Sequence, residues 1–172
     1  YLNKLKNDDA KKLIGGGHVY LYDIDSLALK ICKYSIAIKY GADLLDKIND
    51  IKCDFLNKKI KLPNNSKVIS NPPYYKITEM KSTWKLTDVI KNSKELYSSF
   101  MEKIITQSVS SVIITPYSFI GCDKFYLLRR LMNDYNGFIV SFDNVPGNIF
   151  NGRKHGIFNS NSTNSVRAAI TV

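Results

Sequence analysis

Apolar positions along the chain follow two periods, one typical of amphipathic helices and one typical of short buried strands. Helical spacing, with Gly15-Gly16-Gly17 and Gly41 as stop signals, predicts helices at residues 2–14, 26–40, 95–108 and 126–133. Short runs rich in Val, Ile, Tyr and Phe predict strands at residues 18–22, 51–55, 68–70, 112–115, 137–142 and 166–172. Two polar stretches, residues 75–93 and 143–165, are expected to be loops, the first of them a mobile loop or lid.

Strands that alternate with helices are typical of a mostly parallel sheet with helices on both faces. The sequence therefore predicts an α/β fold, and because no repeat or linker interrupts it, residues 1–172 are expected to form a single domain. Ligands of such sheets bind beyond the carboxyl ends of the strands. Asp23, Asp54 and Asn71 each lie at the end of a predicted strand, so all three are expected at this edge.

The segment Asn71-Pro72-Pro73-Tyr74 carries the most specific chemistry in the chain. Two prolines make a stiff loop that offers carbonyl oxygens and almost no N–H donors. The Asn71 side-chain oxygen and the Pro72 carbonyl can both accept hydrogen bonds from one planar NH₂ group, and the Tyr74 ring offers a stacking surface for the base that carries it. The amine nitrogen then keeps a lone pair with which to attack a methyl donor. The alternative is a proline-stiffened turn that only ends a strand.

Two further positions are candidates for nucleotide binding. A carboxylate at the end of a strand in a nucleotide-binding unit typically accepts hydrogen bonds from ribose hydroxyls, which suits Asp23, and Ile24 can pack on an adenine face. Asp54 can accept from the adenine amine, with the Phe55 ring alongside. The alternatives are a helix cap for Asp23 and an ordinary strand-end turn for Asp54.

Composition narrows the class of protein and of partner. The 172 residues are 44% hydrophobic, enough for a sizeable core, and the formal net charge of +10 favours a polyanion such as DNA or RNA. No apolar run approaches the ~20 residues that span a bilayer, and no signal peptide is recognised. The three cysteines are widely spaced and form no metal pattern with the two histidines. We therefore expect a cytoplasmic protein with reduced thiols, no zinc and no membrane partner.

With these motifs in place, the chain resembles the amino-group DNA methyltransferases of restriction-modification systems. These class I enzymes transfer a methyl group from S-adenosylmethionine to the exocyclic N6 amine of adenine. The resemblance covers nearly the whole chain, and Asn71-Pro72-Pro73-Tyr74 is its most specific part. The other matching segments are Leu21-Tyr22-Asp23-Ile24-Asp25 with Ala28, Asp54-Phe55-Leu56, Leu96-Tyr97-Ser98-Ser99-Phe100, Ile114-Thr115-Pro116-Tyr117-Ser118-Phe119, and the tail Phe142-Asp143-Asn144-Val145-Pro146 with Asn148-Ile149-Phe150.

The resemblance implies a Rossmann-like, mostly parallel sheet with an antiparallel last strand. It implies cofactor-binding roles for Asp23, Ile24, Asp54 and Phe55, and catalytic roles for the Asn71–Tyr74 segment. In the family, a loop between the last two strands supplies another aromatic residue that contacts the extruded base. Phe150 is the first candidate for that role and Phe158 the second. The implied partners are double-stranded DNA with a flipped adenine and a specificity or endonuclease domain or subunit.

One family motif has no counterpart in this chain. It is a strand followed by a glycine-rich turn that holds the methionine part of the cofactor, whereas Gly15-Gly16-Gly17 precedes a predicted strand. We therefore expect the chain to lack the first strand of the sheet and the separate target-recognition domain. Such a truncated chain is expected to bind the cofactor poorly and to be inactive, with a dimer or a rearranged sheet filling the gap.

In the intact enzyme, the expected reaction begins with flipping of an adenine and ends with direct attack of its amine on the sulfonium methyl group, without a metal. Three other functions remain open. Asn-Pro-Pro-Tyr also occurs in methyltransferases that act on guanine amines of ribosomal RNA and in those that act on a protein glutamine amide, because these targets share the planar NH₂. The third alternative, of another class, is a catalytically silent DNA-binding fragment.

Overall fold

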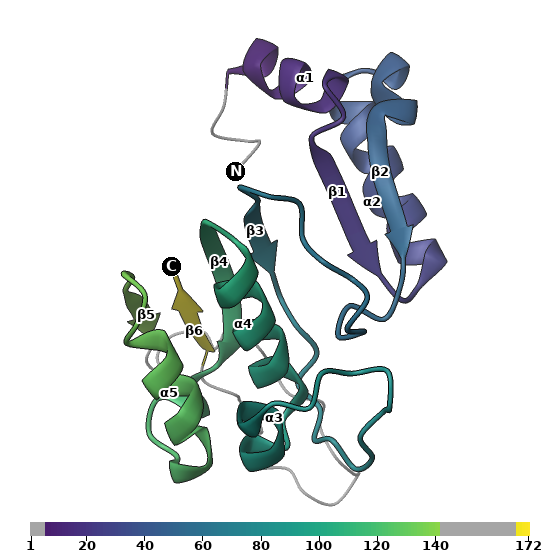
Figure 1. Cartoon of the computed structure of the whole chain (residues 1–172). Coiled ribbons are helices and arrows are strands. Elements are labelled where there is room, and N and C mark those ends of the chain that lie inside the picture. Colours follow the sequence, from purple (N-terminus) through teal and green to yellow (C-terminus); the bar gives the residue numbers. More distant parts are fainter. Residues whose placement is uncertain (1–5, 142–167) are drawn as a thin grey trace, which may run out of the picture. The chain divides into compact units, whose positions relative to one another are not determined.

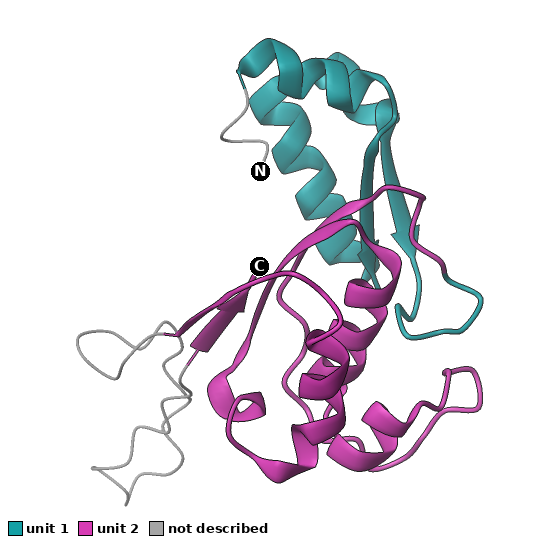
Figure 2. Cartoon of the chain, turned by 60° about the vertical axis from the view of Figure 1, so that its left-hand side comes forward, with its two compact units in different colours: residues 1–60 teal, residues 61–172 magenta. Residues whose placement is uncertain are grey.

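The computed structural model describes residues 6–141 and 168–172 and has an α/β fold (Figure 1). Its contacts divide the chain into two compact units, residues 1–60 and 61–172, which are coloured separately in Figure 2. The α/β class expected from the sequence is confirmed, and the assignment of residues 1–172 to a single catalytic domain stays a prediction.

The first unit is a parallel βαβ arrangement preceded by a helix. Strands β1 and β2 pair in parallel, with Val19 opposite Ile48 and Asp23 opposite Lys52. The buried core of this unit contains Ala10, Ile14 and Tyr40, among others. The elements of the unit are helix α1 (Asn7–Gly15), strand β1 (Val19–Asp23), helix α2 (Ser26–Tyr40), the 3₁₀ helix η2 (Ala42–Lys47) and strand β2 (Ile48–Lys52).

The ends of α2 follow from local chemistry. The Asp25 carboxylate accepts a hydrogen bond from the Leu27 N–H at 2.8 Å and so caps the first turn. At the other end Gly41 has φ of 141°, a conformation that side-chain-bearing residues rarely adopt, and a Cβ there would lie 2.5 Å from Asp43 Oδ1. The bounds predicted for this helix, residues 26–40, are therefore confirmed.

The second unit is a four-stranded mixed sheet with helices packed on it. The strand order is β3-β4-β6-β5, with β3 and β4 parallel and β6 antiparallel to both β4 and β5. The antiparallel last strand expected from the sequence is therefore confirmed. The strands are β3 (Lys67–Ser70), β4 (Ser110–Pro116), β5 (Ile139–Ser141) and β6 (Ala168–Thr171).

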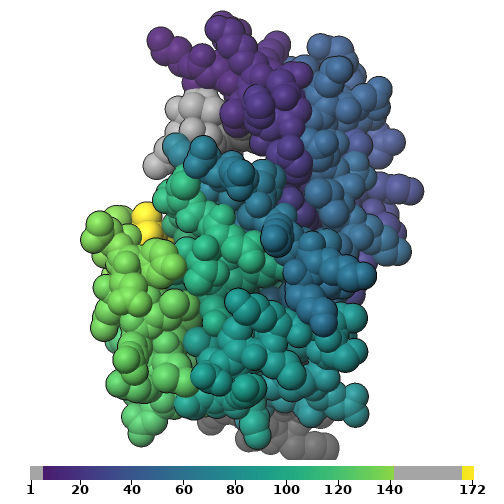
Figure 3. All heavy atoms as spheres, in the orientation of Figure 1, coloured from purple at the N-terminus to yellow at the C-terminus, as the bar shows by residue number. Residues whose placement is uncertain are grey.

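Helix α4 packs against β4 and contributes Tyr97, Met101 and Ile104 to the core. Figure 3 views this helical layer from outside, where side chains of α3 and α4 adjoin those of α5. The remaining elements of the unit are helices α3 (Asp88–Ser93), α4 (Leu96–Gln107) and α5 (Tyr126–Met132), and the 3₁₀ helices η3 (Tyr117–Phe119) and η4 (Asp123–Phe125).

Two sequence-based expectations are corrected. The second strand was expected at residues 51–55 but β2 spans Ile48–Lys52, because Ile48 is a core residue and Asp54 opens a turn instead. The stretch 75–93 was expected to be a loop, yet it contains α3, and Trp84 within it is buried. The Ile77 N–H also donates to the Lys94 carbonyl at 2.8 Å, so this stretch is attached to the unit by backbone hydrogen bonds.

Glu102 gives the second unit a pH dependence. It lies on α4, partly buried, and its carboxylate accepts a hydrogen bond from the Thr87 hydroxyl at 2.5 Å. Burial raises the pKa of Glu102 above its ordinary 4.5, against the lowering effects of the Thr87 bond and Lys85. Because the folded state holds this proton more tightly than the unfolded state, the free energy of unfolding falls as pH rises from the ordinary value through the raised one.

We expect Glu102→Gln to remove this part of the pH dependence, because a glutamine at this position does not titrate. The measurement is urea denaturation of both proteins from about pH 4 to 7. Glu79→Gln is the matched control, because Glu79 is exposed and its loss should leave the slope unchanged. A slope that is equal in wild type and Glu102→Gln would contradict the assignment.

Candidate functional site

The Asn71–Tyr74 segment leaves the carboxyl end of β3 and continues toward the stretch that precedes α3. The Asn71 side chain is exposed, Pro72 is buried, and Pro73 and Tyr74 are partly buried. Neither proline has an N–H, so positions 72 and 73 present no backbone donor. An exposed amide next to donor-free backbone is suited to a group that donates hydrogen bonds.

The Tyr74 side chain holds the Asn71 amide in place. Its hydroxyl lies 2.5 Å from Asn71 Oδ1 and 3.1 Å from the carbonyl oxygen of Ile114 on β4. A phenol has one hydrogen and so donates to one of these acceptors at a time. Burial raises the pKa of Tyr74 from its ordinary 10 to about 12, so the hydroxyl, which is protonated at neutral pH in any case, stays a donor in more alkaline solution as well. With the hydroxyl on Oδ1, the oxygen end of the amide is fixed and one of its two lone pairs is used.

A second tyrosine supports the first. The Tyr97 ring, from α4, meets the Tyr74 ring edge-on, with centroids 6.2 Å apart. The Tyr97 hydroxyl lies 3.0 Å from Ser118 Oγ, and its ring packs at 5.5 Å on Phe125. The sequence placed Tyr97 and Ser118 in matching segments but assigned neither a role. The sequence signal for this contact was a hydroxyl-bearing residue in each of two matching segments, 96–100 and 114–119, which are also rich in aromatic residues.

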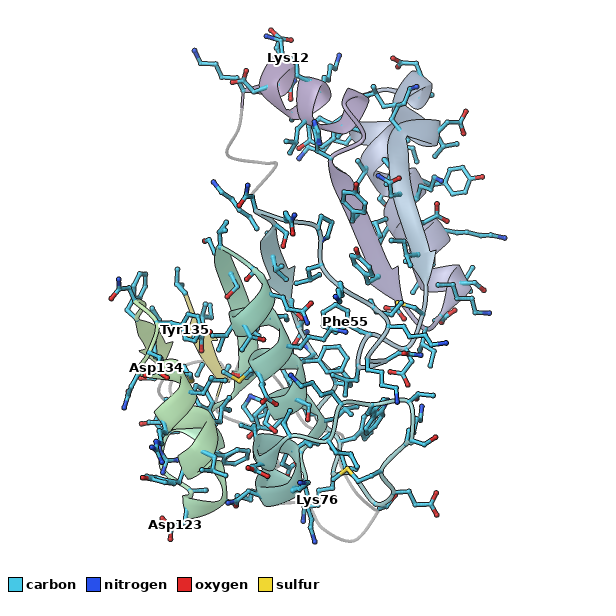
Figure 4. All side chains as sticks on the ribbon, viewed as in Figure 1. Lys12, Phe55, Lys76, Asp123, Asp134 and Tyr135 are labelled. Atoms are coloured by element: carbon cyan, nitrogen blue, oxygen red, sulfur yellow. The ribbon has the colours of Figure 1, made fainter. Side chains whose placement is uncertain are left out.

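The four candidate cofactor residues gather at the carboxyl end of the sheet in the first unit. The Cys53 N–H donates to the Asp23 carbonyl at 2.9 Å, which ties the segment after β2 to the end of β1. The Phe55 ring, labelled in Figure 4, meets the Tyr22 ring edge-on at 5.9 Å, and the Ile24 side chain is exposed. Asp23 and Asp54 therefore follow neighbouring strands in this unit, whereas the expectation that Asn71 shares their edge stays a prediction, because Asn71 follows β3 in the other sheet.

Both candidate carboxylates also serve their own turns. Asp23 Oδ1 accepts from the Asp25 N–H at 2.8 Å, and Asp54 Oδ1 accepts from the Leu56 N–H at 3.2 Å. These are the local bonds that aspartates make in tight turns. Each carboxylate oxygen has more than one lone pair, so a turn role does not by itself exclude a nucleotide role. The helix cap itself is Asp25, not Asp23.

The residue types at these positions are those expected for the adenosine part of S-adenosylmethionine, and their binding of it stays a prediction. The exposed Asp23 carboxylate suits ribose hydroxyls, and the exposed Ile24 side chain suits an adenine face. The glycine turn is not a match for the methionine part, because Gly15–Gly17 precedes β1 rather than following a strand. The base-contacting candidates Phe150 and Phe158, and the tail from Phe142, lie outside the described residues.

Comparison with models of known protein families finds none that matches the chain, and comparison with curated proteins finds no significant match. Within residues 6–141 and 168–172, none of the helices combines the length and apolar character needed to cross a bilayer. In the same described part of the chain, His, Cys, Asp and Glu side chains do not gather in threes where they could hold a metal ion.

The Tyr74 hydroxyl should contribute measurably to stability. Tyr74→Phe removes a bond to Asn71 or Ile114, so we expect the free energy of unfolding to fall by about 1 kcal/mol. Urea denaturation measures the change. Tyr75→Phe is the matched control, because Tyr75 is the next residue and its side chain is exposed. Equal losses in the two variants would show that the hydroxyl of Tyr74 does not anchor the segment.

Proposed function

We propose that this chain carries the amine-acceptor site of an S-adenosylmethionine-dependent methyltransferase that acts on the N6 amine of adenine in DNA. The observation that carries the proposal is the Asn71 amide, exposed beside two prolines, with its oxygen end fixed by the Tyr74 hydroxyl. The remaining lone pair of Asn71 Oδ1 accepts one hydrogen of the amine, and the Pro72 carbonyl accepts the other.

Both hydrogen bonds act on the nucleophile. As the hydrogens are held by acceptors, the nitrogen lone pair is drawn out of conjugation with the ring and becomes available for attack. With the cofactor bound, the nitrogen would form a bond to its methyl carbon while the carbon–sulfur bond breaks and the sulfur leaves as a neutral thioether; the surplus amine proton would then pass to solvent water. S-adenosylmethionine supplies the methyl group when bound. In this proposal Asp23, Ile24, Asp54 and Phe55 bind its adenosine part.

A polyanionic substrate is supported by the charge of the stretch around the motif. Residues 61–94 contain seven lysines against two acidic residues, Glu79 and Asp88. All seven lysines are exposed, including Lys76, which Figure 4 labels. Exposed lysines bind backbone phosphates without reading sequence, and so position a duplex while the amine site selects the base.

Recognition of the amine can be tested without cofactor. The two probes are a duplex with one unpaired adenine and the same duplex in which that adenine is replaced by the unsubstituted base purine, which lacks the N6 amine. We expect the chain to bind the adenine duplex about tenfold more tightly. Asn71→Ala should abolish this preference, whereas Asn92→Ala, at an exposed asparagine on α3, should keep it. Fluorescence anisotropy at fixed salt measures both affinities. Equal affinity of the wild-type chain for the two duplexes would contradict the proposal.

Methyl transfer is tested with tritiated S-adenosylmethionine against DNA, ribosomal RNA and a glutamine-bearing protein substrate. Because this chain shows no glycine-rich turn for the methionine part of the cofactor, we expect total label to be low. What label there is should be in DNA alone, on adenine N6, and at least ~100-fold less in Asn71→Ala, since the amide acts on the reacting nitrogen. Label in RNA or in protein would instead favour one of the two other amine substrates. DNA binding with amine preference but without label in any substrate would identify a silent DNA-binding fragment.

A further inference from the structure

Helix α2 has an apolar stripe on the face that does not contact the sheet. We refer to this set as the α2 stripe: its members are Leu27, Ile31, Tyr34 and Ile38, which are 63%, 58%, 54% and 85% exposed. They are spaced four, three and four residues apart, so they lie in one line along the helix. Large apolar side chains aligned in this way are unusual on a surface that only meets water.

The opposite face of α2 already packs on the unit's own sheet. Leu29, Ala37 and Tyr40 are about 4–5% exposed, and α2 contacts both β1 and β2. The two faces are offset by two residues, which is about 200° around a helix of 3.6 residues per turn. A further strand added beside β1 or β2 would lie in the plane of the sheet, on the far side of α2, and would leave the stripe uncovered.

The spacing of the stripe indicates that another helix covers it. A four-three repeat of apolar residues is the pattern of a coiled-coil seam, in which two helices cross at about 20°. We propose that the α2 stripe pairs antiparallel with the α2 stripe of a second copy of this chain. The twofold axis then passes between Ile31 and Tyr34, so that Leu27 faces Ile38 of the second copy and Ile31 faces its Tyr34.

The helix dipoles favour this antiparallel pairing, because an antiparallel pair places the positive end of each α2 beside the negative end of the other. A parallel pair would instead align the dipoles. The charged residues at the ends of α2 take no part in the seam: Asp25 caps the helix, and Lys39 Nζ lies over the ring of the buried Tyr40, on the opposite face.

The area is sufficient for a weak dimer. With about 200 Å² for each large side chain, the exposed fractions of the stripe amount to roughly 500 Å² per copy, or about 1,000 Å² in total. This is at the lower end of specific interfaces, so association should appear at about 10 μM or above. The proposal does not depend on the chemistry of the Asn71–Tyr74 segment.

Sedimentation velocity from about 5 to 200 μM tests the pairing. We expect wild type to shift from monomer to dimer across this range, and Ile31→Lys to remain monomeric. Because Ile31 is exposed, the variant should keep its circular dichroism spectrum; Ile38→Lys, at the most exposed position, is a second disruption. Leu86→Lys is the control, since Leu86 is a similarly exposed apolar residue in the other unit and its variant should still dimerise.

Orientation is tested by cross-linking in a background where Cys32, Cys53 and Cys122 are replaced by serine. A mixture of Leu27→Cys and Ile38→Cys chains should form mainly mixed disulfide dimers, because an antiparallel pair brings these two positions together. Predominant dimers of one variant alone would overturn the antiparallel register. A monomer at all concentrations, or a dimer that neither lysine variant disrupts, would overturn the proposal. The proposal would also be overturned if the wild-type monomer bound anionic vesicles and both lysine variants abolished that binding.

Discussion

The bond between the Tyr74 hydroxyl and Asn71 is the constraint on which the candidate site depends. An asparagine side chain at the end of a strand can rotate and can present either its oxygen or its nitrogen, and only the oxygen accepts from an amine. When the Tyr74 phenol donates to Oδ1, it holds the oxygen end of the amide in place. Burial raises the pKa of this phenol above its ordinary 10, and its ring meets the Tyr97 ring edge-on.

The same packing connects three segments that are distant in the sequence. Tyr74 follows β3, Tyr97 lies on α4, Ile114 belongs to β4, and Ser118 belongs to the 3₁₀ helix η3 that follows β4. Tyr97 is buried, and its hydroxyl has a hydrogen-bond partner in Ser118 Oγ. The residue that packs against Tyr74 therefore buries no unpaired hydroxyl. A rigid support of this kind is what an acceptor site requires, because a hydrogen bond weakens quickly with distance and angle.

The candidate cofactor residues of the first unit and the Asn71–Tyr74 segment of the second unit are held in place in different ways. In the first unit the aspartates form turns by themselves, and β1 and β2 bring those turns together. In the second unit the Asn71 amide, the proposed acceptor, is held by a contact with Tyr74, which also reaches Ile114 of β4. The aspartate turns can be recognised in a sequence as carboxylates at strand ends. The Asn71–Tyr74 segment can be recognised only as a motif, because the direction of its side chains depends on contacts with distant segments.

The sequence by itself determined the α/β class, the bounds of α2 and the places of Asp23 and Asn71 at strand ends, and the family resemblance predicted the antiparallel last strand. The bounds of α2 and the end of β3 depend on local signals, namely Asp25 and Gly41 at the ends of α2 and the prolines after β3. Only the tertiary structure decided where β2 begins, since Asn49 bonds to the carbonyls of Gly17 and Val19, about thirty residues earlier. It also decided that Tyr74 turns toward β4, that Trp84 is buried, and that α2 keeps an apolar face outside the sheet, because each is set by contacts with distant residues.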